Sequence, residues 1–95
     1  MTAQRSMAEV DRLVMKGTVL RNKIYRAVKG RPGFDCTHPD FWPESWEKEA
    51  AERLWEAHLF SLVKNKSAEQ KYNLLREAIA YAEEAISNQR TEAKL

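Results

Sequence analysis

Apolar residues in the first third of the chain recur every three or four positions. This spacing places them on one side of an α-helix and predicts a helix over about residues 7–29 with one buried stripe. The stripe consists of Val10, Leu13, Val14, Gly17, Leu20, Ile24, Ala27 and Val28. Gly30, Pro32 and Gly33 follow directly. They predict the end of the helix, because glycine accepts a left-handed cap and proline cannot donate the next hydrogen bond.

A second helix is predicted over about residues 43–64, with Pro43 in its first turn. A third is predicted over about residues 67–88, where Ser67 and Gln70 form a capping-box pattern. The apolar stripe of this third helix consists of Leu75, Ala78, Ile79, Ala82, Ala85 and Ile86. The short connection between the second and third helices predicts an antiparallel hairpin. No segment shows the alternation of a β-strand, so we expect an all-α protein of three helices.

Every proline and two of the three glycines fall within residues 30–43, between the first two predicted helices. The same segment contains Phe34, Phe41 and Trp42. Three large aromatic side chains are costly to leave in water. We therefore expect this loop to pack down over a helix.

Some apolar residues exceed what three helices are expected to bury. Met15 and Val19 lie on the otherwise polar side of the first helix, and the second helix ends with apolar residues nearly all round, at Leu59, Phe60 and Val63. Such surface is removed from water when helices of two copies pack together. The pattern predicts a homo-oligomer.

Composition limits the class of protein. The chain has 95 residues, of which 43% are hydrophobic and 32% charged, the balance of a globular protein with one core. We expect a single helical domain over residues 1–95. No segment is apolar for long enough to cross a bilayer, and no apolar segment typical of a signal peptide follows the N-terminus. With Cys36 as its only cysteine, the chain is expected in the cytoplasm.

The net charge of +2 conceals a strong asymmetry. Residues 1–33 contain eight Lys and Arg against two acids, a net charge of +6, and the remainder is acidic. In the first helix, Arg12, Lys16, Lys23 and Arg26 fall opposite the buried stripe, with Tyr25 on their flank. We predict that these five residues bind a ligand or partner, because arginine and lysine attract phosphates and carboxylates and a tyrosine ring can stack on a base. The alternative is a solvated helix face without a binding role.

No catalytic or metal-binding motif is complete. Cys36 and His38 are residue types found in zinc sites and in thiol enzymes. A structural zinc site needs four ligands, however, and a catalytic thiol needs a base with an orienting group. Neither set can be assembled from the sequence. We therefore expect no enzyme activity, no cofactor and no metal ion.

The third predicted helix resembles the C-terminal hairpin helix of the phage anti-CBASS cyclic-nucleotide sponges. Proteins of that family end in a helix of the form Leu-x-Glu-Ala-x-x-aromatic-Ala-x-x-Ala-Ile. The matching residues here are Leu75, Glu77, Ala78, Tyr81, Ala82, Ala85 and Ile86. The similarity covers less than half of the chain, and no ligand-contacting residue is carried over. The resemblance implies a helical oligomer that sequesters cyclic di- or trinucleotides in the host cytoplasm without hydrolysing them.

Three functions thus remain open from the sequence. The first is a non-enzymatic phage-type anti-defence protein that sequesters a cyclic nucleotide. The second is an inhibitor of the anti-CRISPR kind, which blocks a host protein by direct binding. The third is a basic accessory protein that binds nucleic acid, since a helix with exposed Arg, Asn and Lys can serve that purpose.

Overall fold

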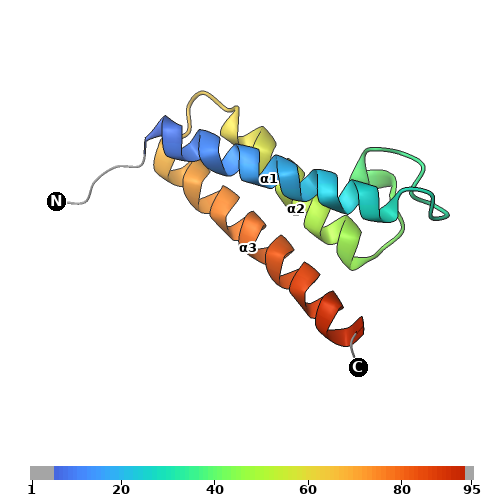
Figure 1. Ribbon diagram of the computed structural model, residues 1–95. Helices are drawn as coiled ribbons and strands as arrows, with labels where there is room; N and C mark the ends of the chain where they lie inside the picture. Colours follow the sequence, from blue (N-terminus) through green and yellow to red (C-terminus); the bar gives the residue numbers. More distant parts are fainter. Residues whose placement is uncertain (1–5, 94–95) are drawn as a thin grey trace.

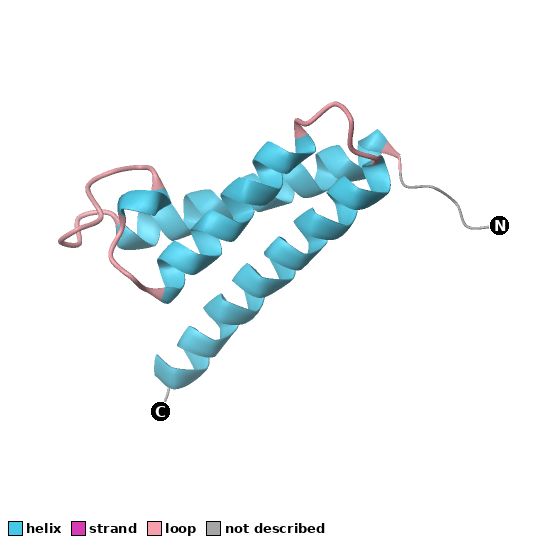
Figure 2. Cartoon of the chain, turned by 180° about the vertical axis from the view of Figure 1, so that it is seen from behind, coloured by secondary structure: helices cyan, strands magenta, loops and turns pink. Residues whose placement is uncertain are grey.

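The computed structural model describes the backbone of residues 6–93 and the side chains of residues 6–89. Three α-helices follow one another, α1 (Met7–Val28), α2 (Trp46–Ser61) and α3 (Ala68–Ala93), with a short 3₁₀ turn, η1 (Pro39–Phe41), before α2 (Figure 1). No strand occurs within residues 6–93, as Figure 2 also shows. The predicted all-α fold of three helices is confirmed. None of the helices in this range is both long and apolar enough to cross a membrane.

A serine caps the start of each helix. The hydroxyl oxygen of Ser6 accepts a hydrogen bond from the Glu9 backbone N–H, and the Glu9 carboxylate accepts one from the Ser6 N–H. Ser67 and Gln70 form the same reciprocal pair at α3, at 3.1 Å in both directions, which confirms the predicted capping box. Each pair satisfies two backbone donors that the first helical turn leaves without partners.

The second helix is shorter than predicted at both ends. It begins at Trp46 rather than at Pro43, because the hydroxyl of Ser45 accepts a hydrogen bond from the Lys48 backbone N–H and fixes the cap there. It ends at Ser61, where the N–H of Leu62 turns back to the carbonyl groups of Leu59 and Phe60. The third helix, in contrast, continues past the predicted residue 88 to Ala93.

The helices pack around one another with α2 antiparallel to both α1 and α3 (Figures 1 and 2). Gly17 lies at their common crossing, where a Cβ on this residue would meet Leu54 of α2 at 3.8 Å and Ile79 of α3 at 4.0 Å. The core spreads from this crossing and contains Val10, Ile24, Val28, Trp42, Ala50, Ala51, Leu54, Ala57, Leu75, Ala78, Ile79 and Ala82. A small residue at the crossing lets the three helices approach closely.

The C-terminal half of α3 diverges from the other two helices (Figures 1 and 2). As a result, Ala85 and Ile86 of the predicted α3 stripe are only half-buried, and Ala27 of the predicted α1 stripe is exposed. These positions, and the half-buried Leu13, Val14 and Leu20 of the α1 stripe, correct the prediction of two fully buried stripes. Helical periodicity places a residue on a face, but it does not say how far along that face a neighbouring helix extends.

The loop of residues 30–43 packs down through Trp42, which is 4% exposed, but not through Phe41, which is 74% exposed. The expectation of burial is therefore wrong for Phe41. A 3₁₀ turn has three residues per turn and places residues three apart on the same side. Pro39 and Trp42 both face the core in this way, and Phe41 is turned outward.

Two glycines shape the start of this loop. Gly30 and Gly33 both have φ of +88°, a conformation that residues with a Cβ rarely adopt. A Cβ on Gly33 would lie 2.6 Å from Pro43 Cγ, whereas one on Gly30 would meet nothing within 4 Å. The two positions therefore share a conformational requirement and differ in steric space.

These glycines give a matched pair of substitutions. Gly30→Ala should lower the free energy of unfolding by about 1–2 kcal/mol, the cost of a left-handed residue with a side chain. Gly33→Ala should lower it by clearly more, because the new methyl group also collides with the Pro43 ring. Urea denaturation of the two variants beside the parent measures the difference. Equal losses would contradict the close approach of Gly33 to Pro43.

Candidate ligand-binding site

Four of the predicted binding residues lie on the outer side of α1. Arg12, Lys16, Lys23 and Arg26 are all exposed. Two of them are partly engaged: Lys16 Nζ lies 3.6 Å from a Glu83 carboxylate oxygen of α3, and Arg26 Nε donates to the Asn22 carbonyl oxygen at 3.3 Å. We call these four cations, together with Met15 and Val19, the outer face of α1.

The outer face is apolar at its middle. Met15 and Val19 are 71% and 62% exposed, among the cations as the sequence predicted. Leu59, Leu62 and Val63 at the end of α2 are also exposed, whereas Phe60 is half-buried. The expected excess of exposed apolar surface is thus present, apart from Phe60.

Tyr25, the fifth predicted residue, does not belong to the outer face. Residues two apart on a helix lie about 160° apart around its axis, so Tyr25 is turned away from Lys23. Its half-buried ring meets the edge of Trp42, with ring centroids 5.4 Å apart and planes at 86°. The structure therefore separates the predicted set into an exposed face of cations and a tyrosine directed at the loop.

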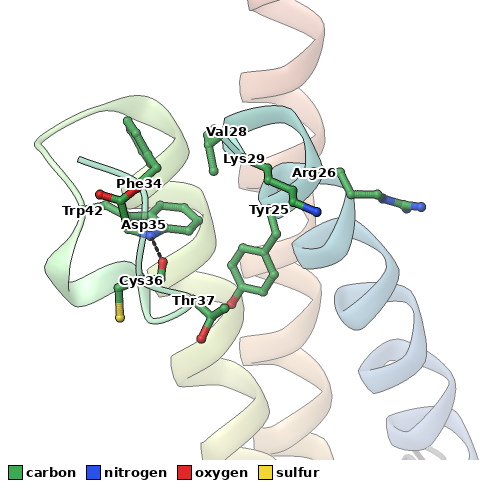
Figure 3. A pocket seen from close by; sticks show the side chains of 9 residues that line it. All are labelled: Tyr25, Arg26, Val28, Lys29, Phe34, Asp35, Cys36, Thr37 and Trp42. Atoms are coloured by element: carbon green, nitrogen blue, oxygen red, sulfur yellow. Dashed lines mark hydrogen bonds between the residues drawn. The ribbon is translucent and has the colours of Figure 1, made fainter. Parts of the chain in front are cut away.

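Tyr25 contributes to a hollow between the end of α1 and the loop. This aromatic hollow has a volume of about 330 Å³, and the rings of Tyr25, Phe34 and Trp42 line it (Figure 3). Arg26 and Lys29 contribute positive charge to the lining and Asp35 contributes one acid, although the Arg26 side chain extends away from the three rings in Figure 3. An apolar lining with a few charged groups beside it is typical of small-ligand sites.

Contacts with the rest of the chain hold the aromatic hollow in shape. The indole Nε1 of Trp42 donates a 2.6 Å hydrogen bond to the Cys36 carbonyl oxygen, drawn in Figure 3. The Phe34 ring lies 5.2 Å from that of Trp42, and the Arg31 guanidinium lies 5.0 Å from the Phe34 centroid. Arg31 also forms an ion pair with the buried Glu47 of α2. The loop is thus fastened to α2 as well as to α1, and a ligand need not order it.

A second hollow lies on the other side of Tyr25 and Thr37, which line both. This arginine hollow has a volume of about 230 Å³ and is further lined by Arg21, Asn22, His38, Pro39 and Trp55. Arg21 lies over the Trp55 ring at 4.7 Å. His58 is stacked on the same ring, with centroids 6.0 Å apart and planes at 12°. Burial lowers the pKa of His58 below its ordinary value of 6.5, and the charge of Arg21 lowers it further.

The side chains of Cys36 and His38 are not arranged as a nucleophile and its base. Cys36 Sγ accepts the backbone N–H of His38 at 3.4 Å. The His38 imidazole turns to η1, where its Nδ1 accepts the Asp40 backbone N–H at 3.4 Å and lies 3.6 Å from an Asp40 carboxylate oxygen. Across the described part of the chain, no three His, Cys, Asp or Glu side chains gather as metal ligands would.

The predicted binding set contains Tyr25 and Arg26 of the two hollows and misses the other lining residues, among them Trp42, Phe34, Lys29 and Arg21. The sequence predicts that Trp42 and Phe34 pack against a helix rather than line a site, and it predicts no role for Lys29. The sequence does contain a signal for Arg21: it follows Gly17 by four residues and precedes Ile24 by three, so helical spacing places it inside the buried stripe. A cation at such a position is unusual enough to mark a candidate site.

No family model, curated protein or solved structure matches this chain. A function can therefore be inferred only from the geometry of the two hollows and the outer face.

Two neighbouring aromatic residues test how the loop is held. Trp42→Ala should lower the free energy of unfolding by about 3–5 kcal/mol, since it empties a buried site. Phe41→Ala should change it by less than about 0.5 kcal/mol, since most of that ring is already in water. Urea denaturation followed by circular dichroism measures both. Similar losses in the two variants would contradict the inward position of Trp42.

The lowered pKa of His58 makes stability depend on pH. As the pH drops below 6.5, His58 takes up a proton in the unfolded chain before it does so in the folded chain. The contribution of neutral His58 to the free energy of unfolding is therefore fully present above this pH and is lost as the pH falls through the lowered pKa of the folded chain. Comparison of the parent with His58→Gln between about pH 8 and pH 5 isolates the effect, because other groups titrate alike in both. The parent should lose stability relative to the variant below pH 6.5. Parallel profiles would show that His58 titrates alike in the folded and unfolded chains.

Proposed function

We propose that this protein is a non-enzymatic binding protein that sequesters a nucleotide-type ligand in the aromatic hollow. The observation that carries the proposal is the grouping of three rings, Tyr25, Phe34 and Trp42, around one hollow beside Arg26 and Lys29. A base stacked on an aromatic side chain contributes about 1–3 kcal/mol, and cations bind the phosphates that accompany it.

The hollow is suited to one base rather than to a whole cyclic oligonucleotide. Its volume of about 330 Å³ is at the small end of the range for ligand sites. Because Trp42 and Arg31 fix the loop beforehand, binding does not require the loop to be ordered at a cost in entropy. A ligand with two or three bases would extend beyond one hollow, and a homo-oligomer would offer one hollow per copy.

Cyclic di- and trinucleotides are the first ligands to test, because the third helix resembles that of the anti-CBASS sponges. The residues of that resemblance are mainly packing residues here: Leu75, Ala78 and Ala82 are buried, and the Arg53 guanidinium lies 4.3 Å from the Tyr81 ring centroid. The resemblance supports a shared hairpin, and the hollow supplies the argument for a ligand. In a phage-infected host, sequestration of such a signal would act in the cytoplasm as an anti-defence function.

The outer face of α1 supports a second candidate function, direct binding to a protein of the host. Met15 and Val19 are exposed between cations, which fits an apolar contact surrounded by acidic residues on the partner. Nucleic-acid binding has less support, because Tyr25, the ring proposed to stack on a base, is turned away from this face.

Calorimetric titration with cyclic di-AMP, cyclic di-GMP and cyclic triadenylate tests the proposal. Tyr25→Leu keeps an apolar side chain but removes the ring, and should weaken binding by about tenfold, the equivalent of one stacking contact. Lys16→Glu with Lys23→Glu reverses the outer face and should change the affinity far less.

Two results would contradict the proposal. One is the absence of heat for all three ligands at high micromolar protein. The other is binding that the outer-face variant loses and Tyr25→Leu keeps, which would move the site to α1. The solution mass of the protein, measured with and without ligand, shows whether a second copy takes part.

A further inference from the structure

Arg21 of α1 and Lys71 of α3 are the two buried cations of the described residues. Arg21 is 8% exposed, although arginine is rarely buried without an acidic partner. The guanidinium lies over the Trp55 ring, and Nη2 donates a long hydrogen bond of 3.4 Å to the Thr18 hydroxyl. The Nε atom is buried without a hydrogen-bond partner. Arg21 forms no ion pair with any residue from 6 to 89.

This arrangement is costly for folding. Arginine remains protonated at any physiological pH, so the buried charge cannot be relieved by losing a proton. An enclosed charge without a counter-charge and a buried donor without an acceptor both destabilise the folded state. Leucine or methionine at this position would pack against Trp55 without either cost. Residues that lower stability in this way are typical of binding sites, where a ligand completes the set of partners.

Arg21 lines the arginine hollow of about 230 Å³, which gives a counter-charge room beside its side chain. Four residues with hydrogen-bonding side chains line this hollow beside Arg21: Asn22, Tyr25, Thr37 and His38. No acidic side chain lines it, and Asp40, the acid beside His38, is exposed. A hollow with a buried cation and no acid in its wall favours an anion.

We infer that the arginine hollow binds a phosphate group and that Arg21 is the main residue that binds it. Phosphate fits best because its oxygens accept several hydrogen bonds at once and match the fork of a guanidinium. This inference rests on the proposed function in one respect: Tyr25 and Thr37 line both hollows, so the phosphate is that of the ligand whose base occupies the aromatic hollow. Arg21 is then a binding residue absent from the predicted set.

Inorganic phosphate is the simplest probe. It is added at constant ionic strength to ¹⁵N-labelled protein, and the Nε–H signals of the arginine side chains are followed by NMR, with chloride as the reference anion. The Arg21 signal should shift and saturate with phosphate but not with chloride. Arg21→Met should weaken phosphate binding by about tenfold or more, the effect of losing a charge-assisted hydrogen bond. The matched control is Arg76→Met, on an exposed position of α3, which should bind phosphate as the parent does.

Thermal melting supplies a second readout. Arg21→Met removes the unpaired charge, so without phosphate it should melt at or above the temperature of the parent, and phosphate should raise the melting temperature of the parent alone. If Arg21→Met fails to fold, Arg21→Lys replaces it: the lysine keeps the charge without the planar fork and should bind phosphate more weakly. A parent Arg21 signal that responds equally to chloride, or an Arg21→Met variant that binds phosphate fully, would overturn the inference.

Adenosine and AMP separate this inference from the proposed function. Both inferences together predict that AMP binds more tightly than adenosine in the parent, and that Arg21→Met loses most of this difference. If adenosine and AMP bind equally in the parent as well, the phosphate site fails while the aromatic hollow stands. If phosphate shifts Arg21 but neither adenosine nor any cyclic nucleotide binds, the arginine hollow is an anion site and the proposed nucleotide function fails.

Discussion

Burial of the Trp42 indole is the interaction on which the rest of the candidate site depends. The ring closes the open end of the α1–α2 pair, meets Tyr25 and Phe34, and anchors the loop through its hydrogen bond to Cys36. The Arg31–Glu47 ion pair, the buried Pro39 and the contact of the His38 ring with Trp55 also hold residues 30–43 to the helices. Both hollows lie between this loop and α1, so the same contact that completes the core also forms the site.

Charge and shape are divided between two surfaces of α1. The outer face has most of the exposed cations of α1, and of its residues only Arg26 lines one of the two hollows, whereas the side that faces the loop has both hollows and fewer charges. A diffuse positive field attracts anions from a distance, but an enclosed site binds them selectively. Under the proposed function, the outer face would raise the local concentration of an anionic ligand, and the hollows would provide the specific contacts.

The environment of Trp55 shows how stability and binding compete within one small core. Arg21 and His58 both lie against this ring, and each has a buried nitrogen without a partner. The free energy of unfolding of a chain of 95 residues is small, about 5–15 kcal/mol. Two buried nitrogens without partners in one cluster lower the stability of the fold, which favours a role of this cluster in binding rather than in folding.

The sequence by itself determined the helices, because the spacing of Val10, Gly17, Ile24 and Val28 and the cap at Ser67 are local signals. It also placed Met15 and Val19 outside the buried stripe of α1, where both are exposed. Only the tertiary structure decided the site. Periodicity could not show that Tyr25 turns to Trp42 or that Phe41 turns outward, since both depend on the path of an irregular loop. Nor could it show that Arg21, within the stripe, would be buried without a counter-charge, because that depends on what α2 and the loop place around it.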